Sequence, residues 1–322
     1  MIPLRDSNRS TTFPVVNSCI IAASILAFII ELTQGQTIAA FIYRYGLVPS
    51  RYADPQLAAR FTAGQQVLPF FTSLFLHGGI FHLVGNMWFL YIFGDNVEDR
   101  LGHLRYLFFY LLCGLAAGVS HLVINWGANT PTIGASGAIA GVMGAYLVLY
   151  PRAKVLTLIP LFFFFPFVEV PAFFFLGIWL LFQLVSAAGE TGHVGGVAFW
   201  AHIGGFIFGI IFLKLIELVP RMGVQDTMQR WTRKQTTPRL HMIHPVGSGG
   251  SLDLRGNMTV SEREARVGGR KLVTFARDRA KRTFSLQIPP GITPGTALRL
   301  RGMGKHTAEG LKGDLYLTIE IK

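Results

Sequence analysis

Six long apolar runs fill most of the first 220 residues and constrain the fold more than any other feature of the chain. They lie at about residues 14–33, 79–94, 104–125, 136–150, 171–187 and 196–217. A helix needs about 20 mostly apolar residues to cross a bilayer. Charged residues make up only 14% of the chain, against about 25% in a typical soluble domain. The sequence therefore predicts an α-helical polytopic membrane protein with six transmembrane helices.

The charges divide the chain into two parts. Residues 1–220 hold 10 Lys and Arg and 9 Asp and Glu, whereas residues 221–322 hold 19 and 8. The second part has no apolar run long enough to span a bilayer. It starts with Thr-, Pro-, Ser- and Gly-rich sequence, which is typical of a linker. We predict a membrane domain at 1–220, a linker at 221–251 and a small all-β domain at 252–322.

Short basic loops give the orientation of the helices. With six helices, four basic segments fall on one side of the membrane: the N-terminal segment, the loops after the second and fourth helices, and the C-terminal part. The positive-inside rule makes that side the cytoplasm, so both ends of the chain are expected there. The first run lacks the cleavage pattern of a signal peptide and is read as a retained helix. The predicted location is a bacterial inner (plasma) membrane.

The stretch between the fourth and fifth helices is apolar but is not expected to be a helix. Within Val155–Phe167, Pro160 and Pro166 would interrupt one. We expect a buried or interfacial loop over residues 155–170, with a re-entrant segment as the alternative.

Polar residues cluster near the starts of the second, fourth and sixth helices, which all begin on the same side of the membrane. The polar residues are His77, His82, Asn86, Ser136 and His202, and Gly134 and Gly137 lie on either side of Ser136. Polar side chains inside a membrane are costly and indicate a functional site by default. We expect them to meet in one layer just below the outer surface.

The residue types in this layer suit acyl transfer. Ser136 is a candidate nucleophile that needs a base to take its proton, and His202 is the candidate base. His82 and Asn86 are four residues apart on one helix face and can donate hydrogen bonds to an oxyanion. Gly134 and Gly137 allow a substrate backbone to approach Ser136. The set predicts a Ser–His dyad with no acidic partner.

Each residue also has a simpler interpretation. A Gly-x-Ser-Gly tetrapeptide occurs by chance, and Ser136 could merely cap its helix. A lone histidine such as His202 is more often structural, and His77 could cap a loop. The coincidence of three such places at one depth favours catalysis.

The motifs around these residues resemble the rhomboid intramembrane serine proteases. The matching motifs are His77-x4-His82-x3-Asn86, Gly134-Ala135-Ser136-Gly137 and Ala201-His202-x2-Gly205-x3-Gly209. The resemblance implies the rhomboid fold, with Ser136 and His202 as the catalytic dyad. It implies that His82, Asn86 and the backbone N–H of Ser136 form the oxyanion hole, and that His77 has a supporting role. It also implies cleavage of transmembrane proteins near the outer face of the membrane, with no metal and no cofactor.

The chain departs from the family in one loop, and in another loop the resemblance implies a lid. Many members of the family carry a Trp-Arg pair in the first outer loop, where this chain has Tyr43-Arg44-Tyr45 instead. The glycine-rich segment 189–196 is expected to act as a lid over the site.

The C-terminal part shows five strand-like runs separated by turn residues, at 257–260, 271–275, 283–288, 297–300 and 314–321. It resembles the client-binding C-terminal β-domain of J-domain (DnaJ-type) co-chaperones. The resemblance rests on Ile288-Pro289-Pro290-Gly291, Leu298-Arg299-Leu300-x-Gly302-x-Gly304 and Gly313-Asp314-Leu315-Tyr316. No His-Pro-Asp signature of a J-domain occurs. The implied partner is an extended polypeptide bound along a sheet edge.

Three functions compete. The leading hypothesis is an intramembrane serine endopeptidase acting on transmembrane protein substrates in a lipid bilayer. The alternative is a catalytically silent pseudoprotease that binds or chaperones membrane proteins. A transporter ranks last, because the helices carry almost no charge at mid-depth. The basic C-terminal part has no nucleic-acid-binding motif, so we expect an interaction with anionic lipid and none with nucleic acid.

Overall fold

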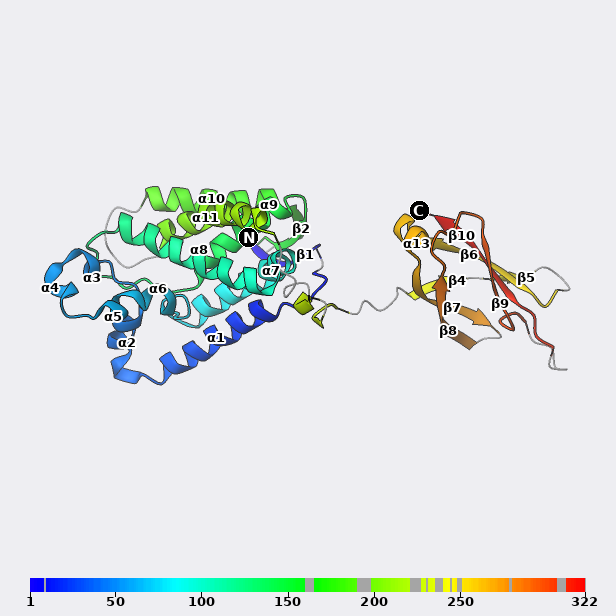
Figure 1. Ribbon diagram of the computed structural model, residues 1–322, viewed down its shortest axis with the longest axis horizontal. Helices are drawn as coiled ribbons and strands as arrows, with labels where there is room; N and C mark the ends of the chain where they lie inside the picture. The colour runs from blue at the N-terminus through cyan, green and yellow to red at the C-terminus, as the bar shows by residue number, and fades with distance from the viewer. Residues whose placement is uncertain are drawn as a thin grey trace. The chain divides into compact units, whose positions relative to one another are not determined.

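The structure is a computed structural model in which the chain divides into two compact units, Met1–Lys234 and Gln235–Lys322 (Figure 1). The residues that the structure describes are 1–8, 10–159, 165–189, 198–220, 227–229, 231–234, 240–243, 245–247, 251–277, 280–305 and 311–321.

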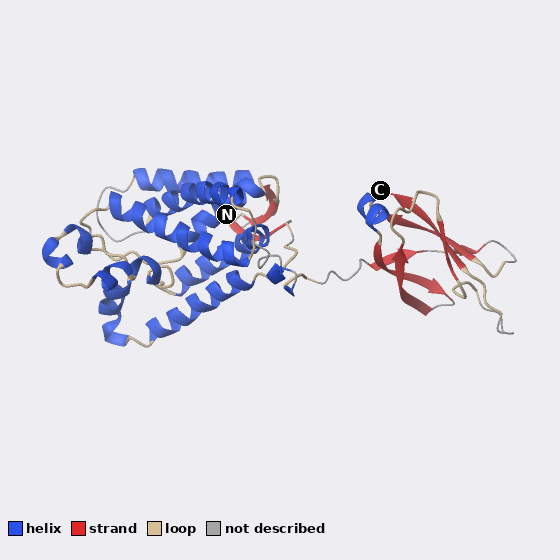
Figure 2. Ribbon diagram, viewed as in Figure 1, coloured by secondary structure: helices blue, strands red, loops and turns tan. Residues whose placement is uncertain are grey.

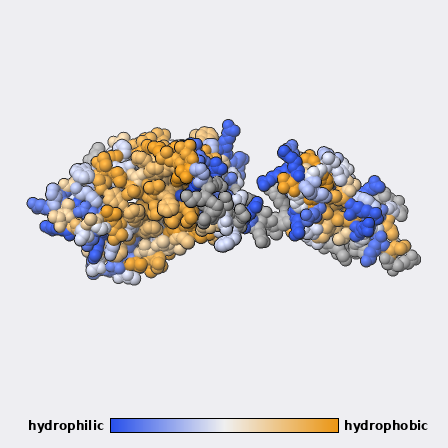
Figure 3. Space-filling view, in the orientation of Figure 1, coloured by the Kyte–Doolittle hydropathy of each residue, from blue (hydrophilic) through white to orange (hydrophobic). Residues whose placement is uncertain are grey.

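Helices occupy each of the six apolar runs of the first unit and form a bundle (Figure 2). They are α1 (Val15–Leu32), α7 (Ile80–Leu101), α8 (His103–Ile124), α9 (Ser136–Leu149), α10 (Ala172–Ala188) and α11 (Phe199–Leu218). Hydrophobic residues cover much of the visible face of this unit (Figure 3). The exposed side chains include Phe81 on α7 and Phe182 on α10, as expected of helices that face lipid.

Three of these helices, α1, α8 and α11, are long and apolar enough to cross a membrane. The predicted count of six spans is not confirmed. Helix α7 has 22 residues, but its last two turns carry Asp95, Glu98, Asp99 and Arg100. Helices α9 and α10 are apolar but have only 14 and 17 residues.

Helix α9 is the centre of the bundle. Ten consecutive residues of this helix are buried, from Gly137 to Tyr146. It packs against α7, α8 and α11. A helix that is apolar on all sides must be buried in this way. Because Ser136 is the first residue of α9, the most enclosed helix of the bundle holds the candidate nucleophile.

The long connection between α1 and α7 folds into short helices around one buried arginine. The elements are a 3-10 turn at Gly35–Thr37, α2 (Ile38–Tyr45), α3 (Ser50–Ala53), α4 (Pro55–Ala58), α5 (Ala63–Val67) and α6 (Pro69–Thr72). Arg51 is fully buried, and its guanidinium donates to the carbonyl oxygens of Tyr43, Arg44 and Gln65 at 3.1, 3.2 and 2.7 Å. It also lies 3.8 Å from the ring centroid of Phe61. Arg51 therefore ties together the loop that lacks the Trp-Arg pair.

The segment after α9 is not a loop throughout. Strands β2 (Lys154–Leu158) and β3 (Phe167–Pro171) pair antiparallel, and β2 also pairs with β1 (Ile2–Asp6) at the N-terminus. Pro166 lies just outside β3, where it removes no ladder hydrogen bond. The prediction of a loop over 155–170 is therefore wrong for both strands.

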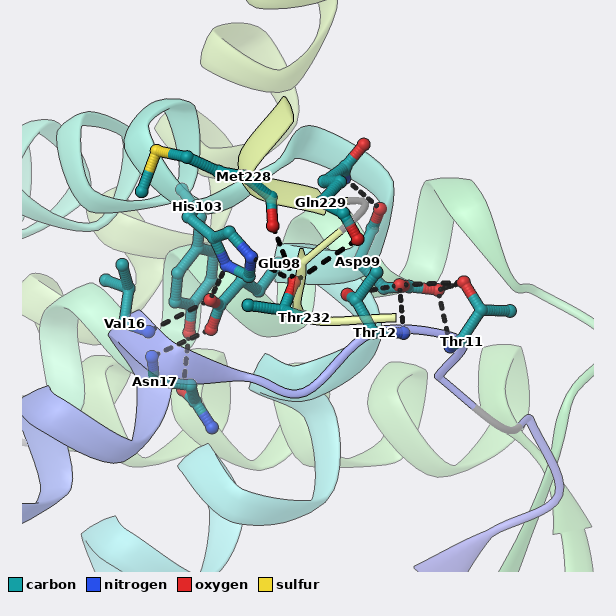
Figure 4. A network of polar contacts seen from close by, with 11 residues as sticks. Thr11, Thr12, Val16, Asn17, Glu98, Asp99, His103, Met228, Gln229 and Thr232 are labelled. Carbon is teal, nitrogen blue, oxygen red and sulfur yellow. Dashed lines mark hydrogen bonds and ion pairs between the residues drawn. The ribbon is translucent and has the colours of Figure 1, made fainter. Parts of the chain in front are cut away.

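A polar network holds the chain ends of the first unit beside the end of α7 (Figure 4). The buried Glu98 carboxylate accepts from the backbone N–H groups of Val16 and Asn17 at 2.9 and 2.8 Å, at the start of α1. It also lies 2.5 Å from His103 Nδ1, whose Nε2 contacts Thr232 Oγ at 2.8 Å. Glu98 thereby satisfies two backbone donors that a helix N-terminus leaves free.

The second unit consists of two sheets that share a hydrophobic core. One sheet has the order β5-β6-β10-β9 and the other β4-β7-β8. The strands are β4 (Leu240–Ile243), β5 (Val246–Gly247), β6 (Leu254–Val260), β7 (Gly269–Arg277), β8 (Ala280–Ile288), β9 (Ala297–Leu300) and β10 (Leu315–Ile321). A short helix, α13 (Glu262–Val267), begins with the capping box of Ser261 and Glu264. Strands β4 and β5 lie in the stretch predicted as linker. They belong to the sheets of the second unit, because β4 pairs with β7 and β5 with β6.

Candidate active site

Ser136 and His202 are in direct contact. The Oγ atom of Ser136 lies 2.7 Å from Nε2 of His202, which is within hydrogen-bond distance. Ser136 is the first residue of α9 and His202 is the fourth of α11. His202 is only 8% exposed. Two residues that are 66 positions apart in the sequence are thus joined at the start of two neighbouring helices.

Glycines allow these two helices to approach so closely. A Cβ atom at Gly205 would lie 2.0 Å from the carbonyl oxygen of Gly137, and one at Gly209 would lie 2.2 Å from that of Gly141. The two pairs are four residues apart on each helix, which is the small-xxx-small pattern of close helix packing. The glycines of α9 and α11 therefore set the distance between Ser136 and His202.

His82, Asn86 and Gly134 meet next to Ser136. A Cβ atom at Gly134 would lie 2.8 Å from Nε2 of His82 and 3.7 Å from Nδ2 of Asn86. Gly134 also has a φ of +124°, which L side chains rarely adopt. Only glycine therefore fits here, for both reasons.

Asn86 is buried, and its Nδ2 has no hydrogen-bond partner in the described part of the chain. An unpaired buried donor costs free energy, so Asn86 Nδ2 would gain from an acceptor that enters the site. The side chain of His82 is more exposed, and its Nδ1 accepts from the backbone N–H of Gly78 at 3.3 Å. These two side chains can donate to an oxygen atom that arrives beside Ser136.

His77 lies behind His82 and does not contact Ser136 in any described hydrogen bond. Its ring is buried and packs edge-on against His82, with the centroids 5.2 Å apart. The backbone N–H of His77 donates to the buried Glu31 carboxylate of α1 at 3.0 Å. His77 thus fixes the segment before α7 and the position of the His82 ring.

Gly137 packs rather than faces a ligand. A Cβ atom at Gly137 would lie 2.5 Å from the Cβ of Ala117 on α8. Gly137 is therefore needed for the packing of three helices around Ser136.

Two residues of α10 were missed by the reasoning from sequence. Oε1 of Gln183 lies 2.7 Å from Nδ1 of His202, on the side of the ring opposite Ser136. The Trp179 ring lies 6.0 Å from the His202 ring, measured between centroids. The signal available in the sequence was a single glutamine inside an apolar helix.

The arrangement places the Ser136 hydroxyl next to a base, the His202 imidazole. A hydroxyl at hydrogen-bond distance from an imidazole, which is itself held by a third group, is the general pattern of an activated nucleophile. The third group here is an amide and not a carboxylate.

A lid was predicted at residues 189–196. All of this segment except residue 189 lies outside the described residues.

Comparison with known families identifies two domains in the chain. The Rhomboid domain matches residues 64–217, and the DnaJ C terminal domain matches residues 254–322. Both predicted resemblances are confirmed at the level of the domain.

Curated relatives match the first domain at moderate identity. Rhomboid protein 1, mitochondrial, from Saccharomyces cerevisiae is 31% identical over 169 residues, covering 49% of this chain and 45% of the relative. Presenilin-associated rhomboid-like protein, mitochondrial, from Bos taurus is 28% identical over 188 residues, covering 57% and 45%. Rhomboid-like protein 11, chloroplastic, from Arabidopsis thaliana is 25% identical over 175 residues, covering 50% and 56%. The chain spans about half the length of these relatives.

The relatives overturn the predicted location. The proteins named above are mitochondrial or chloroplast proteins of eukaryotes, so the prediction of a bacterial inner membrane, with cytoplasmic ends, is wrong. The physical reason is that basic loops report which side of a membrane a segment faces and carry no information about which membrane it is.

Proposed function

Since the chain carries a rhomboid domain joined to a DnaJ C terminal domain, we propose that it is an intramembrane serine endopeptidase with a polypeptide-binding appendage. The single observation that carries this proposal is the 2.7 Å contact between Ser136 Oγ and His202 Nε2. The substrates we propose are transmembrane segments of other membrane proteins. Cleavage is expected near the membrane face opposite the ends of the chain.

The proposal includes six membrane crossings. Helices α7, α9 and α10 would cross together with α1, α8 and α11. In this arrangement α9 covers only part of the bilayer, because its 14 residues span about 21 Å at 1.5 Å per residue. Its first residue, Ser136, then lies below the membrane surface instead of at it. A site at this depth needs water, so we propose a polar cavity that opens toward the nearer face.

In the proposed mechanism, Nε2 of His202 takes the proton from Ser136 Oγ as this oxygen attacks the scissile carbonyl carbon. The carbonyl oxygen becomes an oxyanion. Asn86 Nδ2, the His82 side chain and the backbone N–H of Ser136 donate to it. His202 then gives its proton to the leaving amine, and the C–N bond breaks.

Water completes the cycle. It attacks the acyl group on Ser136 while His202 Nε2 accepts its proton, and the proton then returns to Ser136 Oγ as the ester bond breaks. The unpaired Nδ2 of Asn86 supports this mechanism, because its cost in the resting protein is offset when the oxyanion forms.

The substrate must expose a peptide bond that a helix normally hides. A transmembrane helix with Gly or Pro near the cleavage site unwinds at lower cost than one without. We therefore propose a preference for substrates with such residues.

The appendage is proposed to bind extended polypeptide along a sheet edge. Strands β8 and β9 each lie at the edge of a sheet in the described part of the unit. An extended segment can add to such an edge by main-chain hydrogen bonds. The proposed organisation is a membrane domain at 1–220, a linker at 221–251 and a β domain at 252–322, with strands β4 and β5 of the linker stretch paired to the β domain.

A cleavage assay in proteoliposomes tests the enzymatic proposal. The wild type, Ser136→Ala and His202→Ala are incubated with a reporter whose transmembrane helix contains Gly or Pro. The wild type is expected to cleave, and each variant is expected to lose at least 1000-fold in rate. The Leu184→Met variant, on the exposed face of α10, is the control. Cleavage by Ser136→Ala at the wild-type rate would refute the proposal, and binding of the reporter without cleavage would favour a pseudoprotease.

A truncation tests the appendage. Removing residues 235–322 is expected to slow cleavage of substrates with long extended tails, while substrates without tails are cleaved as before. Unchanged rates for both kinds of substrate would refute the proposed role.

A further inference from the structure

One polar side chain that contacts the dyad, Gln183, belongs to α10. We propose that Gln183 is a positioning residue that holds His202 in the one tautomer able to accept the proton of Ser136. This inference rests on the proposed function where it concerns rate. Its structural part, the tautomer of His202, is independent of any activity.

The two ring nitrogens of His202 have separate partners. Nε2 faces Ser136 Oγ at 2.7 Å, and Nδ1 faces Gln183 Oε1 at 2.7 Å. A neutral imidazole carries a proton on one nitrogen and a lone pair on the other. With the amide oxygen of Gln183 facing the ring, Nδ1 has to donate and therefore carries the proton. The lone pair is then on Nε2, where the serine proton has to go.

The position of Gln183 on α10 allows it to reach the ring. Trp179 and Gln183 are four residues apart and therefore lie on the same face of the helix. The Trp179 ring packs 6.0 Å from the His202 ring and also stacks on Phe206, with those centroids 6.0 Å apart. Trp179 thus limits tilting of the imidazole, while Gln183 fixes its rotation through a hydrogen bond.

The surroundings explain why an amide suits this position. His202 is buried, and the Trp179 and Phe206 rings that pack beside it are apolar. A carboxylate in an apolar environment needs a compensating charge. A glutamine selects the tautomer without adding a charge, and it also satisfies a buried N–H that would otherwise be unpaired.

Kinetics with two variants of Gln183 provide the first test. Gln183→Leu removes the acceptor with little change in volume, and it should lower kcat about 10-fold with KM unchanged, since one neutral hydrogen bond is lost. Gln183→Glu has an oxygen that can accept in either protonation state, so it should restore most of the rate. Leu184→Met is the control on the adjacent residue. Wild-type kcat in Gln183→Leu would overturn the role in catalysis.

Nitrogen-15 NMR of the full chain provides the second test and needs no substrate. Ring nitrogens with and without a proton differ in their shifts, and His202 is assigned by comparison with His202→Asn among the 9 histidines. The wild type should show the proton on Nδ1, and Gln183→Leu should show a mixture of tautomers. A proton on Nε2 in the wild type, or identical spectra for both proteins, would overturn the proposal.

The two tests separate the two claims. If the wild type cleaves no reporter and Ser136 reacts with no fluorophosphonate probe, the proposed protease function fails. The NMR comparison still decides whether Gln183 sets the tautomer of His202. If the wild type cleaves and Gln183→Leu does so equally well, the protease stands and the positioning role fails.

Discussion

A methyl group at Gly205 tests whether helix packing sets the geometry of the dyad. In Gly205→Ala, the new Cβ atom would lie 2.0 Å from the carbonyl oxygen of Gly137, whereas ordinary contacts begin at 3.4 Å. The helices must therefore separate by about 1.4 Å, the difference between these two distances. If that separation adds to the 2.7 Å between Ser136 Oγ and His202 Nε2, the atoms move to about 4 Å, beyond hydrogen-bond range.

The expected loss of activity follows from this displacement. A misplacement of about 1 Å at a reacting group can cost about 100-fold in rate. The strain of overpacking is about 1–3 kcal/mol, partly offset by about 1 kcal/mol from the better helix propensity of alanine. We therefore expect a folded protein with kcat reduced about 100-fold.

The assay is cleavage of the reporter in proteoliposomes, together with thermal unfolding in detergent. Gly177→Ala on α10 is the matched control, because a Cβ atom there meets no other atom within 4 Å. This control should keep the wild-type rate. A folded Gly205→Ala variant that cleaves as fast as the wild type would refute the link between glycine packing and catalysis.

Three further predictions concern residues outside the dyad. Glu98→Ala leaves the backbone donors of Val16 and Asn17 without their acceptor, so unfolding in detergent should show a loss of about 2–5 kcal/mol, and an unchanged Tm would contradict the structure. Arg51→Lys cannot reach all three carbonyl groups, so hydrogen exchange should become faster across residues 38–72, with no change at the C-terminal unit, and equal exchange in both proteins would argue against the buried arginine. Burial raises the pKa of Asp6 to about 6, even though Tyr146 donates a hydrogen bond to it. Because the folded chain then binds this proton more tightly than the unfolded chain, stability should fall as the pH rises from about 4 to about 6, and a Tm series in which Asp6→Asn shows the same pH slope as the wild type would refute this.

Helices and strands could be predicted from sequence where the pattern is local. Apolar runs of suitable length predicted α1, α8 and α11, and alternation of apolar and polar residues predicted β10. The β1–β2 pairing could not be predicted in the same way, because it joins Ile2–Asp6 to residues about 150 positions later. Strand β4 was read as linker because it is only 4 residues long and is defined by its partner β7.

The site shows the same division between local and distant information. Ser136, His202, His82 and Asn86 could be singled out because each is polar in an apolar helix near a helix start. Gln183 satisfies the first condition but lies near the end of α10, so its contact with His202 depends on how two helices pack. Arg51 was not singled out from the sequence. Nothing in the sequence alone indicates that it is fully buried.

Covalent labelling of Ser136 tests the central claim most directly, because it needs no knowledge of the natural substrate. The full chain in proteoliposomes is treated with a fluorophosphonate probe, and the modified residue is located by peptide mass spectrometry. An activated serine predicts labelling of Ser136 in the wild type, at least 100-fold slower labelling in His202→Ala, and none in Ser136→Ala. Equal rates in the wild type and His202→Ala, or no modification of Ser136, would contradict a Ser136–His202 dyad.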